Sequence, residues 1–331
     1  MTQTSVEEQV STFQENLQQV REELGRAIVG LDDVINQLLT AVIAGGHVLF
    51  EGVPGVGKTL LALSLGRVLG LTNQRIQFTP DLMPADILGS HILVEDGAPR
   101  MEFIKGPVFT QVLLADEINR CTPKTQAALL EAMQERAVTI SGSRHELDEL
   151  FFTIATQNPI EMEGTYPLPE AQLDRFFFKI IVPPPDINNL RQIGRLTTGN
   201  DVPEAAETLT KENVLALQNL VREVPVPETA EEYAARLILS TSPQEASAPS
   251  QVKEYVRYGA SPRGMQALML GSKVKALMDG RFSASSQDVR AVCLPALRHR
   301  IILNFEAEAE GIITDDILEA LFESVPAPGQ S

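Results

Sequence analysis

The sequence contains no tryptophan, only two cysteines and only four histidines among its 331 residues. Cys121 and Cys293 lie far apart and belong to no C-x-x-C pair, so we expect both thiols to be reduced and structural. The histidines, at positions 47, 91, 145 and 299, show no ligand spacing such as H-E-x-x-H. These scarcities argue against a disulfide scaffold and against a transition-metal site.

Positive charge and long apolar runs are also scarce. The 27 Lys and Arg residues face 44 Asp and Glu residues, giving a net charge of −17, and the basic residues form no cluster. Such a surface disfavours nucleic acid as a partner unless an oligomer gathers a few basic loops in its pore.

No stretch approaches the roughly 20 apolar residues that a membrane span needs, and the polar N-terminus is unlike a signal peptide. We therefore expect a cytoplasmic protein with no membrane span.

The most informative stretch is residues 52–59, G-V-P-G-V-G-K-T, which fits the pattern G-x-x-x-x-G-K-[ST]. An apolar run precedes it and an amphipathic helical pattern follows it, which is the strand, loop and helix context of a phosphate-binding P-loop. The backbone, the helix N-terminus and Lys58 would hold the phosphates of a nucleotide, and Thr59 would hold Mg²⁺. The predicted nucleotide-binding residues here are Gly52, Pro54, Gly55, Val56, Gly57, Lys58, Thr59 and Leu60.

A second motif consists of Asp116 and Glu117, which end the apolar run at 112–115. Such a run is typical of a buried parallel strand whose carboxyl end faces the ligand. Two acids after a strand often cap a helix, but after a P-loop they indicate a Walker B motif. Asp116 would then hold Mg²⁺, and Glu117 would polarise the attacking water. A further strand at 153–156 leads to Asn158, which either contacts the γ-phosphate or water, or only initiates an Asn-Pro turn.

The remaining pattern predicts two domains. Strands at 75–78 and 177–182 complete a five-stranded parallel sheet sandwiched by helices, and the prolines at 183–185 end this first domain, residues 1–185. Two inserted hairpins are expected, one pairing 90–94 with 101–104 and the other pairing 137–140 with 149–152. Residues 186–331 show helical patterns, with a capping box at Ser285 and Asp288, and no convincing strand. They predict a small all-α domain.

Two further positions have open interpretations. Val29 and Gly30 lie in a turn that serves either as a simple helix–helix corner or as a contact for adenine. Arg263 lies in the first turn of a helix that Ser261 caps and Pro262 opens. A cation there opposes the helix dipole unless an anion lies nearby, which favours a functional role for Arg263.

Five strands around a P-loop, followed by a helical segment, resemble the AAA+ ATPases, and five motifs narrow the resemblance to the MoxR family. They are E-G-V-P-G-V-G-K-T, L-A-D-E-I-N-R, A-T-Q-N-P, L-D-R-F and G-A-S-P-R, and the likeness covers roughly residues 5 to 320. By resemblance, Asn158 matches sensor 1, and Arg175 matches the arginine finger that reaches the neighbouring subunit's nucleotide. Arg263 matches sensor 2, which contacts the subunit's own nucleotide, and Arg120 is a second candidate for action across the interface.

The resemblance implies a ring-forming ATPase that hydrolyses ATP to ADP and phosphate with Mg²⁺, as a homo-oligomer and most simply a hexamer. Members of the MoxR family are chaperone-like remodellers that act on proteins with von Willebrand factor A domains, in complex assembly and maturation or in metal-cofactor insertion. The helical domain would be the lid over the nucleotide.

Three other functions fit the same motifs. One is a nucleic-acid motor like the MCM relatives, which stimulation of the ATPase by DNA would favour. Another is a motor subunit of the magnesium-chelatase type, which activity with partner subunits would favour. The third is a nucleotide-gated assembly switch that turns over slowly.

Overall fold

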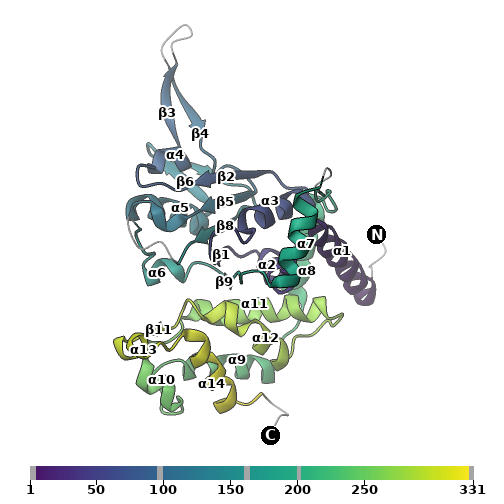
Figure 1. Cartoon of the computed structure of the whole chain (residues 1–331), viewed down its shortest axis with the longest axis vertical. Helices are drawn as coiled ribbons and strands as arrows, with labels where there is room; N and C mark the ends of the chain where they lie inside the picture. Colours follow the sequence, from purple (N-terminus) through teal and green to yellow (C-terminus); the bar gives the residue numbers. More distant parts are fainter. Residues whose placement is uncertain (1–4, 95–99, 160–164, 200–202, 328–331) are drawn as a thin grey trace.

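The computed structural model describes residues 5–94, 100–159, 165–199 and 203–327. They form an α/β layer, in the upper half of Figure 1, and a helical layer beneath it. Within these ranges, no helix is long and apolar enough to cross a membrane.

The α/β layer is built on a five-stranded sheet in which all neighbouring strands are parallel. In spatial order the strands are β2 (Asn73–Gln77), β5 (Val112–Asp116), β8 (Phe152–Gln157), β1 (Val48–Glu51) and β9 (Phe178–Ile181). The prediction of a five-stranded parallel sheet is confirmed. Because β8 alone separates β1 from β5, the P-loop and the two acids after β5 emerge close together at the same edge.

Alternate side chains of the strands pack into two cores. Leu113 and Ala115 of β5 belong to the core shared with α4 (Pro84–Leu88) and α5 (Pro123–Glu135). Val112 and Leu114 belong to the core shared with α1 (Val6–Ala27), α2 (Asp32–Ile43) and α3 (Lys58–Val68). Helices thus cover both faces, which is why β5 is apolar at successive positions and buried along its whole length.

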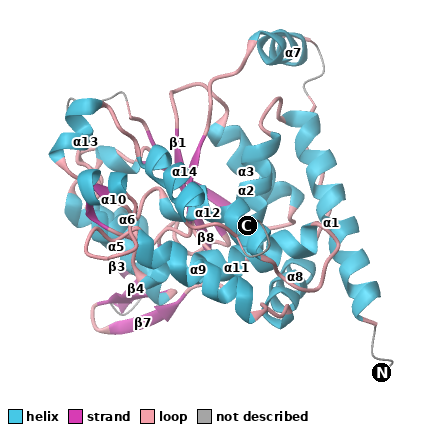
Figure 2. Ribbon diagram, turned by 90° about the horizontal axis from the view of Figure 1, so that it is seen from below, coloured by secondary structure: helices cyan, strands magenta, loops and turns pink. Residues whose placement is uncertain are grey.

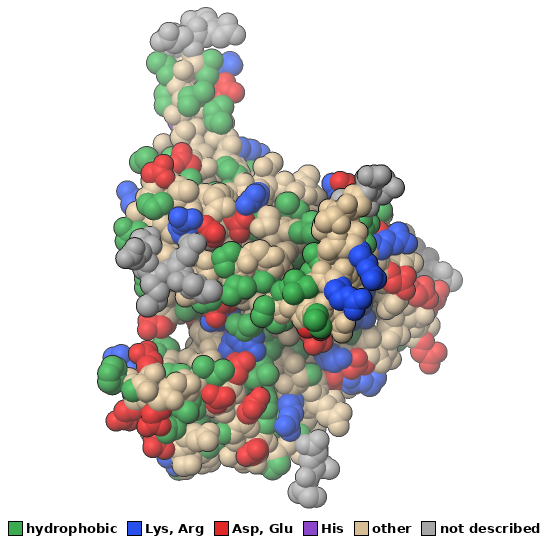
Figure 3. Space-filling model, viewed as in Figure 1, with side chains coloured by type: hydrophobic (Ala, Val, Ile, Leu, Met, Phe, Trp, Pro, Cys, Tyr) green, Lys and Arg blue, Asp and Glu red, His purple; other side chains and the backbone are tan. Residues whose placement is uncertain are grey.

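The first predicted hairpin is confirmed. β3 (Gly89–Val94) pairs antiparallel with β4 (Arg100–Lys105), while the expected turn at 95–99 lies outside the described residues. The hairpin projects from the α/β layer (Figure 1), and Figure 3 shows hydrophobic side chains along it. Leu93 and Met101, which face each other across the hairpin, are 56% and 63% exposed.

The second predicted hairpin has the wrong partner strand. β6 (Ala137–Ile140) pairs with β7 (Ser143–Glu146), not with 149–152, and Phe152 begins β8 instead. The turn is the dipeptide Ser141-Gly142, with φ of 51° and 82°. Two residues with positive φ make the tight turn whose twist suits an antiparallel pair, so the strand resumes at once rather than after a long loop.

The helical layer contains six helices within the described residues: α9 (Glu228–Ser240), α10 (Ser250–Tyr255), α11 (Pro262–Met278), α12 (Ser286–Leu297), α13 (Phe305–Glu310) and α14 (Thr314–Ser324). The prediction of no strand after residue 186 is wrong in one place. β10 (Val256–Tyr258) and β11 (Ile302–Leu303) form a short antiparallel pair. At two or three residues each, these strands are too short for their alternation to register in a sequence pattern.

The described parts of residues 187–223, which are 187–199 and 203–223, link β9 to the helical layer. α7 (Ile187–Thr197) lies at the edge of the molecule in Figure 2, and α8 (Lys211–Glu223) packs near α2 and α11. Between them, the amides of Thr208 and Leu209 donate to the carbonyl oxygen of Val68, at 2.8 and 3.0 Å. The domain boundary after residue 185 remains a prediction.

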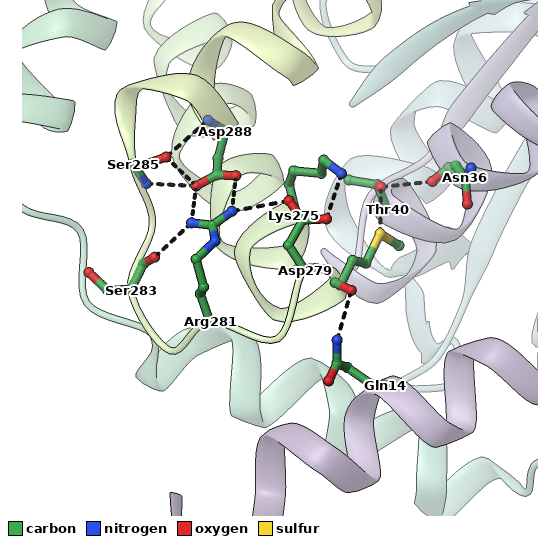
Figure 4. Close-up of polar contacts among 10 residues, drawn as sticks. Gln14, Asn36, Thr40, Lys275, Asp279, Arg281, Ser283, Ser285 and Asp288 are labelled. Atoms are coloured by element: carbon green, nitrogen blue, oxygen red, sulfur yellow. Dashed lines mark hydrogen bonds and ion pairs between the residues drawn. The ribbon is translucent and has the colours of Figure 1, made fainter. Parts of the chain in front are cut away.

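Polar contacts also join the N-terminal helices to the helical layer (Figure 4). Gln14 of α1 donates to the carbonyl oxygen of Met278, at 3.2 Å.

The predicted capping box at the start of α12 is confirmed: the Ser285 and Asp288 side chains each bond the other's backbone amide. The Asp288 carboxylate is 3% exposed and also accepts two bonds from Arg281, at 2.6 and 2.8 Å. These bonds leave the buried Asp288 charge paired.

The buried His47, just before β1, predicts that acid destabilises the fold. Its Nε2 lies 3.1 Å from the Met133 carbonyl oxygen, and its Nδ1 accepts the Thr153 amide hydrogen at 2.9 Å, so the folded ring is neutral. Burial lowers the pKa of His47 from 6.5 to about 4. The unfolded chain therefore binds the extra proton first, and the free energy of unfolding falls as pH drops from 6.5 towards 4, by about 3 kcal/mol at most.

Urea unfolding at pH 7.0 and 5.0 measures this loss. His47→Gln should reduce the difference between the two midpoints, leaving the part due to His299, whose pKa burial also lowers. An unchanged difference in the variant would assign the acid sensitivity to other groups.

Candidate nucleotide site

The P-loop connects β1 to α3 through glycines whose backbone conformations are demanding. Gly55 and Gly57 have φ of +82° and +88°, a region that residues with a Cβ rarely adopt. A Cβ on Gly52 would lie 2.6 Å from the Val182 carbonyl oxygen, so glycine also allows β1 and the chain after β9 to approach closely. Gly57 is the N-cap of α3 and offers no side-chain cap, so the first-turn amides of that helix are available to an anion.

Lys58 begins α3 and curls back over this loop. Its ammonium group donates to the carbonyl oxygen of Gly52. Half-burial lowers the pKa of Lys58, while the nearby carboxylates of Asp116, Glu117 and Glu51 act in the opposite direction. The loop thus combines backbone donors with a cation facing inward, which is the requirement for holding a polyphosphate.

The carboxylate of Asp116 binds side chains from three other elements, α3, β8 and β2. Its Oδ2 accepts the Thr59 hydroxyl at 3.0 Å, and its Oδ1 accepts the Thr156 hydroxyl at 2.7 Å. Arg75 of β2 donates to Oδ2 from Nη2 and Nε, at 2.8 and 3.1 Å. The hydroxyl and carboxylate oxygens of Thr59 and Asp116 are hard ligands at the base of a phosphate loop, so this donor set fits Mg²⁺.

Glu117, the next residue, has a left-handed backbone conformation, with φ of 57° and ψ of 50°. Its amide donates to the Thr156 hydroxyl at 2.8 Å. Its carboxylate accepts bonds from Gln77 Nε2 at 2.8 Å and from Arg120 Nη1 at 2.9 Å. A non-glycine residue in this conformation carries strain, and the surrounding bonds hold the carboxylate at the strand edge.

Three of these contributors were missed by sequence reasoning: Arg75, Gln77 and Thr156. Their signal is the strand order, because β2 lies beside β5 with Gln77 in register with Asp116. Residues at the carboxyl ends of strands next to β5 were candidates on that ground alone.

Asn158 lies where the sequence predicted, just after β8 and therefore between the P-loop strand and the strand of Asp116. It is 4% exposed, and its carbonyl oxygen lies 3.4 Å from Asn119 Nδ2. Its role as sensor 1 remains a prediction.

An apolar pocket adjoins the P-loop. Val29, Gly30, Val56 and Leu60 line it, together with the prolines at 183–185 and with Leu196 and its neighbours on α7. The turn at 28–30 is therefore placed beside the P-loop, and this favours the adenine contact over a simple helix corner. An apolar slot next to a phosphate cradle suits a planar base.

Arg175 and Arg263 do not line this pocket. Arg175 follows α6 (Glu170–Leu173) and borders a separate surface hollow with Glu131 and Gln172. Arg263, in the first turn of α11, lies 3.4 Å from Asp174. Asp174 is thus the anion that lies near this cation in the first turn of α11, and a contact of Arg263 with the subunit's own nucleotide remains a prediction. α6, which precedes Arg175, lies on the opposite side of the α/β layer from α7, whose residues line the pocket (Figure 1).

Comparisons with known proteins agree with this geometry. Residues 47–178 match the model of the ATPase family associated with various cellular activities, and residues 249–321 match that of the AAA lid domain. A crystal structure of a candidate ATPase from Cytophaga hutchinsonii superposes with a TM-score of 0.90 at 40% identity, covering 96% of this chain and 97% of that one.

Relatives in two other organisms carry the MoxR name. Chaperone MoxR1 of Mycobacterium tuberculosis is 42% identical over 92% of this chain and 81% of its own length. Protein MoxR of Methylorubrum extorquens is 34% identical over 92% of this chain and 93% of its own length. With identities of this size over nearly the whole chain, the protein belongs to the MoxR family of AAA+ ATPases.

Proposed function

We propose that this protein binds ATP with Mg²⁺ and hydrolyses it to ADP and phosphate in a homo-oligomeric ring, a hexamer. The observation that carries the proposal is the contact of Thr59 with Asp116 beneath the P-loop, with the carboxylate of Glu117 fixed beside it. A phosphate cradle, oxygen ligands for a cation and an adjacent base are the parts that phosphoryl transfer to water requires.

Each residue then has a defined task. The P-loop amides and Lys58 hold the β- and γ-phosphates, and the apolar pocket at Val29 and Gly30 takes the adenine. Bound at Thr59 and Asp116, Mg²⁺ would neutralise charge that develops on the phosphate oxygens. Glu117 accepts a proton from the attacking water, and Asn158 orients that water. Gln77 and Arg120 must release or share the Glu117 carboxylate for this to happen, since both bond it in the present state.

Arg175 completes the site of the neighbouring subunit. Its position at the edge away from the pocket supports action across an interface rather than within one chain. An arginine supplied in this way contributes about 10³ to 10⁵ in rate. Hydrolysis by this protein therefore depends on assembly.

The ring acts as a chaperone-like remodeller of a protein that carries a von Willebrand factor A domain, in complex maturation or metal-cofactor insertion. The name of the Mycobacterium relative, Chaperone MoxR1, and the projecting β3–β4 hairpin with its exposed Leu93 and Met101 support this role. The net charge of −17 weighs against a nucleic-acid motor.

Glu117→Gln should bind ATP with unchanged affinity and assemble, while its turnover falls by about 10² or more, because the amide cannot accept the proton. Lys58→Ala is the matched control and should lose about 10-fold or more in ATP affinity, since a charge-assisted contact is removed. Fluorescent-nucleotide titration and phosphate release separate the two effects. Retained turnover in Glu117→Gln would show that Glu117 is not the base that accepts the proton of the attacking water.

Arg175→Ala should retain ATP binding but lose hydrolysis, and should regain it in rings mixed with Lys58→Ala subunits. The Lys58→Ala subunit has no working site of its own but still supplies Arg175 to its neighbour. Phosphate release at several mixing ratios checks this. Absence of recovery, with both variants in the same rings, would place Arg175 in its own subunit's site.

A pull-down from cytosol with ATP-loaded Glu117→Gln should retain a protein with a von Willebrand factor A domain that Lys58→Ala does not retain. Mass spectrometry identifies the captured protein. Specific retention of nucleic acid and its processing proteins would support the motor function instead.

A further inference from the structure

Asp174, the residue before Arg175, connects the α/β layer to the helical layer. Its carboxylate accepts the Ser261 hydroxyl at 2.8 and 3.0 Å, Arg300 Nε at 2.9 Å and Arg263 Nη1 at 3.4 Å. All three donors belong to the helical layer, at the start of α11 or just after α12. The contacts described for Asp116 and Glu117 include none of these donors, so Asp174 organises a separate cluster.

Arg300 holds the same segment through its backbone. Its side chain is 2% exposed, and its donors reach the carbonyl oxygens of Phe176, Phe177 and Asp174 at 2.7, 3.1 and 3.2 Å. With the Asp174 carboxylate and the Ala296 carbonyl, five acceptors meet the five N–H donors of the guanidinium. A buried arginine satisfied in this way is fixed in one geometry. The carbonyls that it holds flank Arg175 on both sides.

His299 adds another contact to the same segment. Its Nε2 lies 2.9 Å from the Phe176 carbonyl oxygen, and the ring is 6% exposed. The hollow between α6 and the helical layer, visible at the left of Figure 3, is lined by Glu170, Asp174, Ser261 and Arg300. The two layers thus meet in this region through polar contacts that surround Arg175.

We propose that Asp174 and Arg300 are positioning residues that make the placement of Arg175, and hence hydrolysis in the neighbouring subunit, follow the position of the subunit's own lid. This inference rests on the proposed ring with Arg175 acting across the interface. Ser261 caps α11, so movement of that helix changes its bond to Asp174 directly. Arg300 carries the motion of the chain after α12 to the carbonyls beside Arg175.

The contact of Arg263 with Asp174 indicates how a bound nucleotide could alter the position of Arg175. Its side chain is 42% exposed and its bond to Asp174 is long, whereas Arg300 is buried and tightly bound. Arg263 is therefore the partner that an anion can withdraw from Asp174. An anion bound beside α11 would compete with Asp174 for Arg263 and weaken one of the contacts next to Arg175.

Asp174→Asn tests the inference because the amide keeps the size of the side chain and loses its charge. We expect unchanged ATP affinity, a lower thermal midpoint because the buried Arg300 loses its counter-charge, and a loss of turnover of about 10²-fold, as for a reacting group displaced by about 1 Å. Asp279→Asn is the matched control. Asp279 lies at the end of α11 opposite Ser261 and pairs with Lys275 and Arg281, so the turnover of this variant should not change.

Mixed rings separate positioning from a general structural role. Asp174→Asn subunits should regain turnover when mixed with Lys58→Ala subunits, which donate an intact Arg175. They should gain nothing from Arg175→Ala subunits. Recovery with neither, or native turnover in Asp174→Asn alone, would overturn the inference. If Arg175→Ala itself is not rescued by Lys58→Ala, the proposed action across the interface fails instead.

Ser261→Ala covers the case in which Asp174→Asn lowers the thermal midpoint strongly. It removes one donor to Asp174 and leaves the Arg300 contact in place. We expect a loss of turnover of several-fold with the same rescue by Lys58→Ala subunits, whereas native turnover in this variant would count against the link to α11.

Discussion

The site depends on the carboxylate of Asp116, which ties three strands and the P-loop helix to one point. It accepts hydroxyl hydrogens from Thr59 on α3 and from Thr156 on β8, and it pairs with Arg75 on β2. A carboxylate that is 8% exposed needs such partners, because a buried charge without them costs several kcal/mol. A cation bound between Thr59 and Asp116 would replace the hydrogen bond between them. The Asp116 charge is already buried, so no new carboxylate would have to be desolvated.

This arrangement gives the subunit two functional edges. The P-loop and the apolar pocket lie towards α7, and the segment of Arg175 lies towards α6 on the opposite side of the sheet (Figure 1). One carboxylate organises each edge: Asp116 at the nucleotide pocket and Asp174 beside Arg175. In the proposed ring, the first edge of one subunit would face the second edge of the next, so neither edge alone would contain every group that phosphoryl transfer uses.

Local pattern was sufficient for much of the fold and the site. The P-loop, the strand of Asp116 and the helix caps were predictable because glycine spacing, unbroken apolar runs and capping residues act over a few positions. The second hairpin was wrong because two residues, Ser141 and Gly142, form the turn where a longer loop was expected. Arg75, Gln77 and Arg300 were not predictable, because their partners are distant in the sequence and depend on strand order and on how the layers pack.

The packing of the two layers constrains the motion that can couple them. α11 and α12 share one continuous apolar core with α1, α2 and β9, so a lid that swung away would expose side chains such as Phe178 and Leu268, both now fully buried. At about 25 cal/mol per Å² of apolar area, opening even one large side chain costs on the order of 2 kcal/mol. Small sliding of packed helices is cheaper than separation. Such small shifts suffice for hydrogen bonds, which weaken over a few tenths of an ångström, so the polar contacts beside Arg175 would respond to a motion that leaves the apolar core closed.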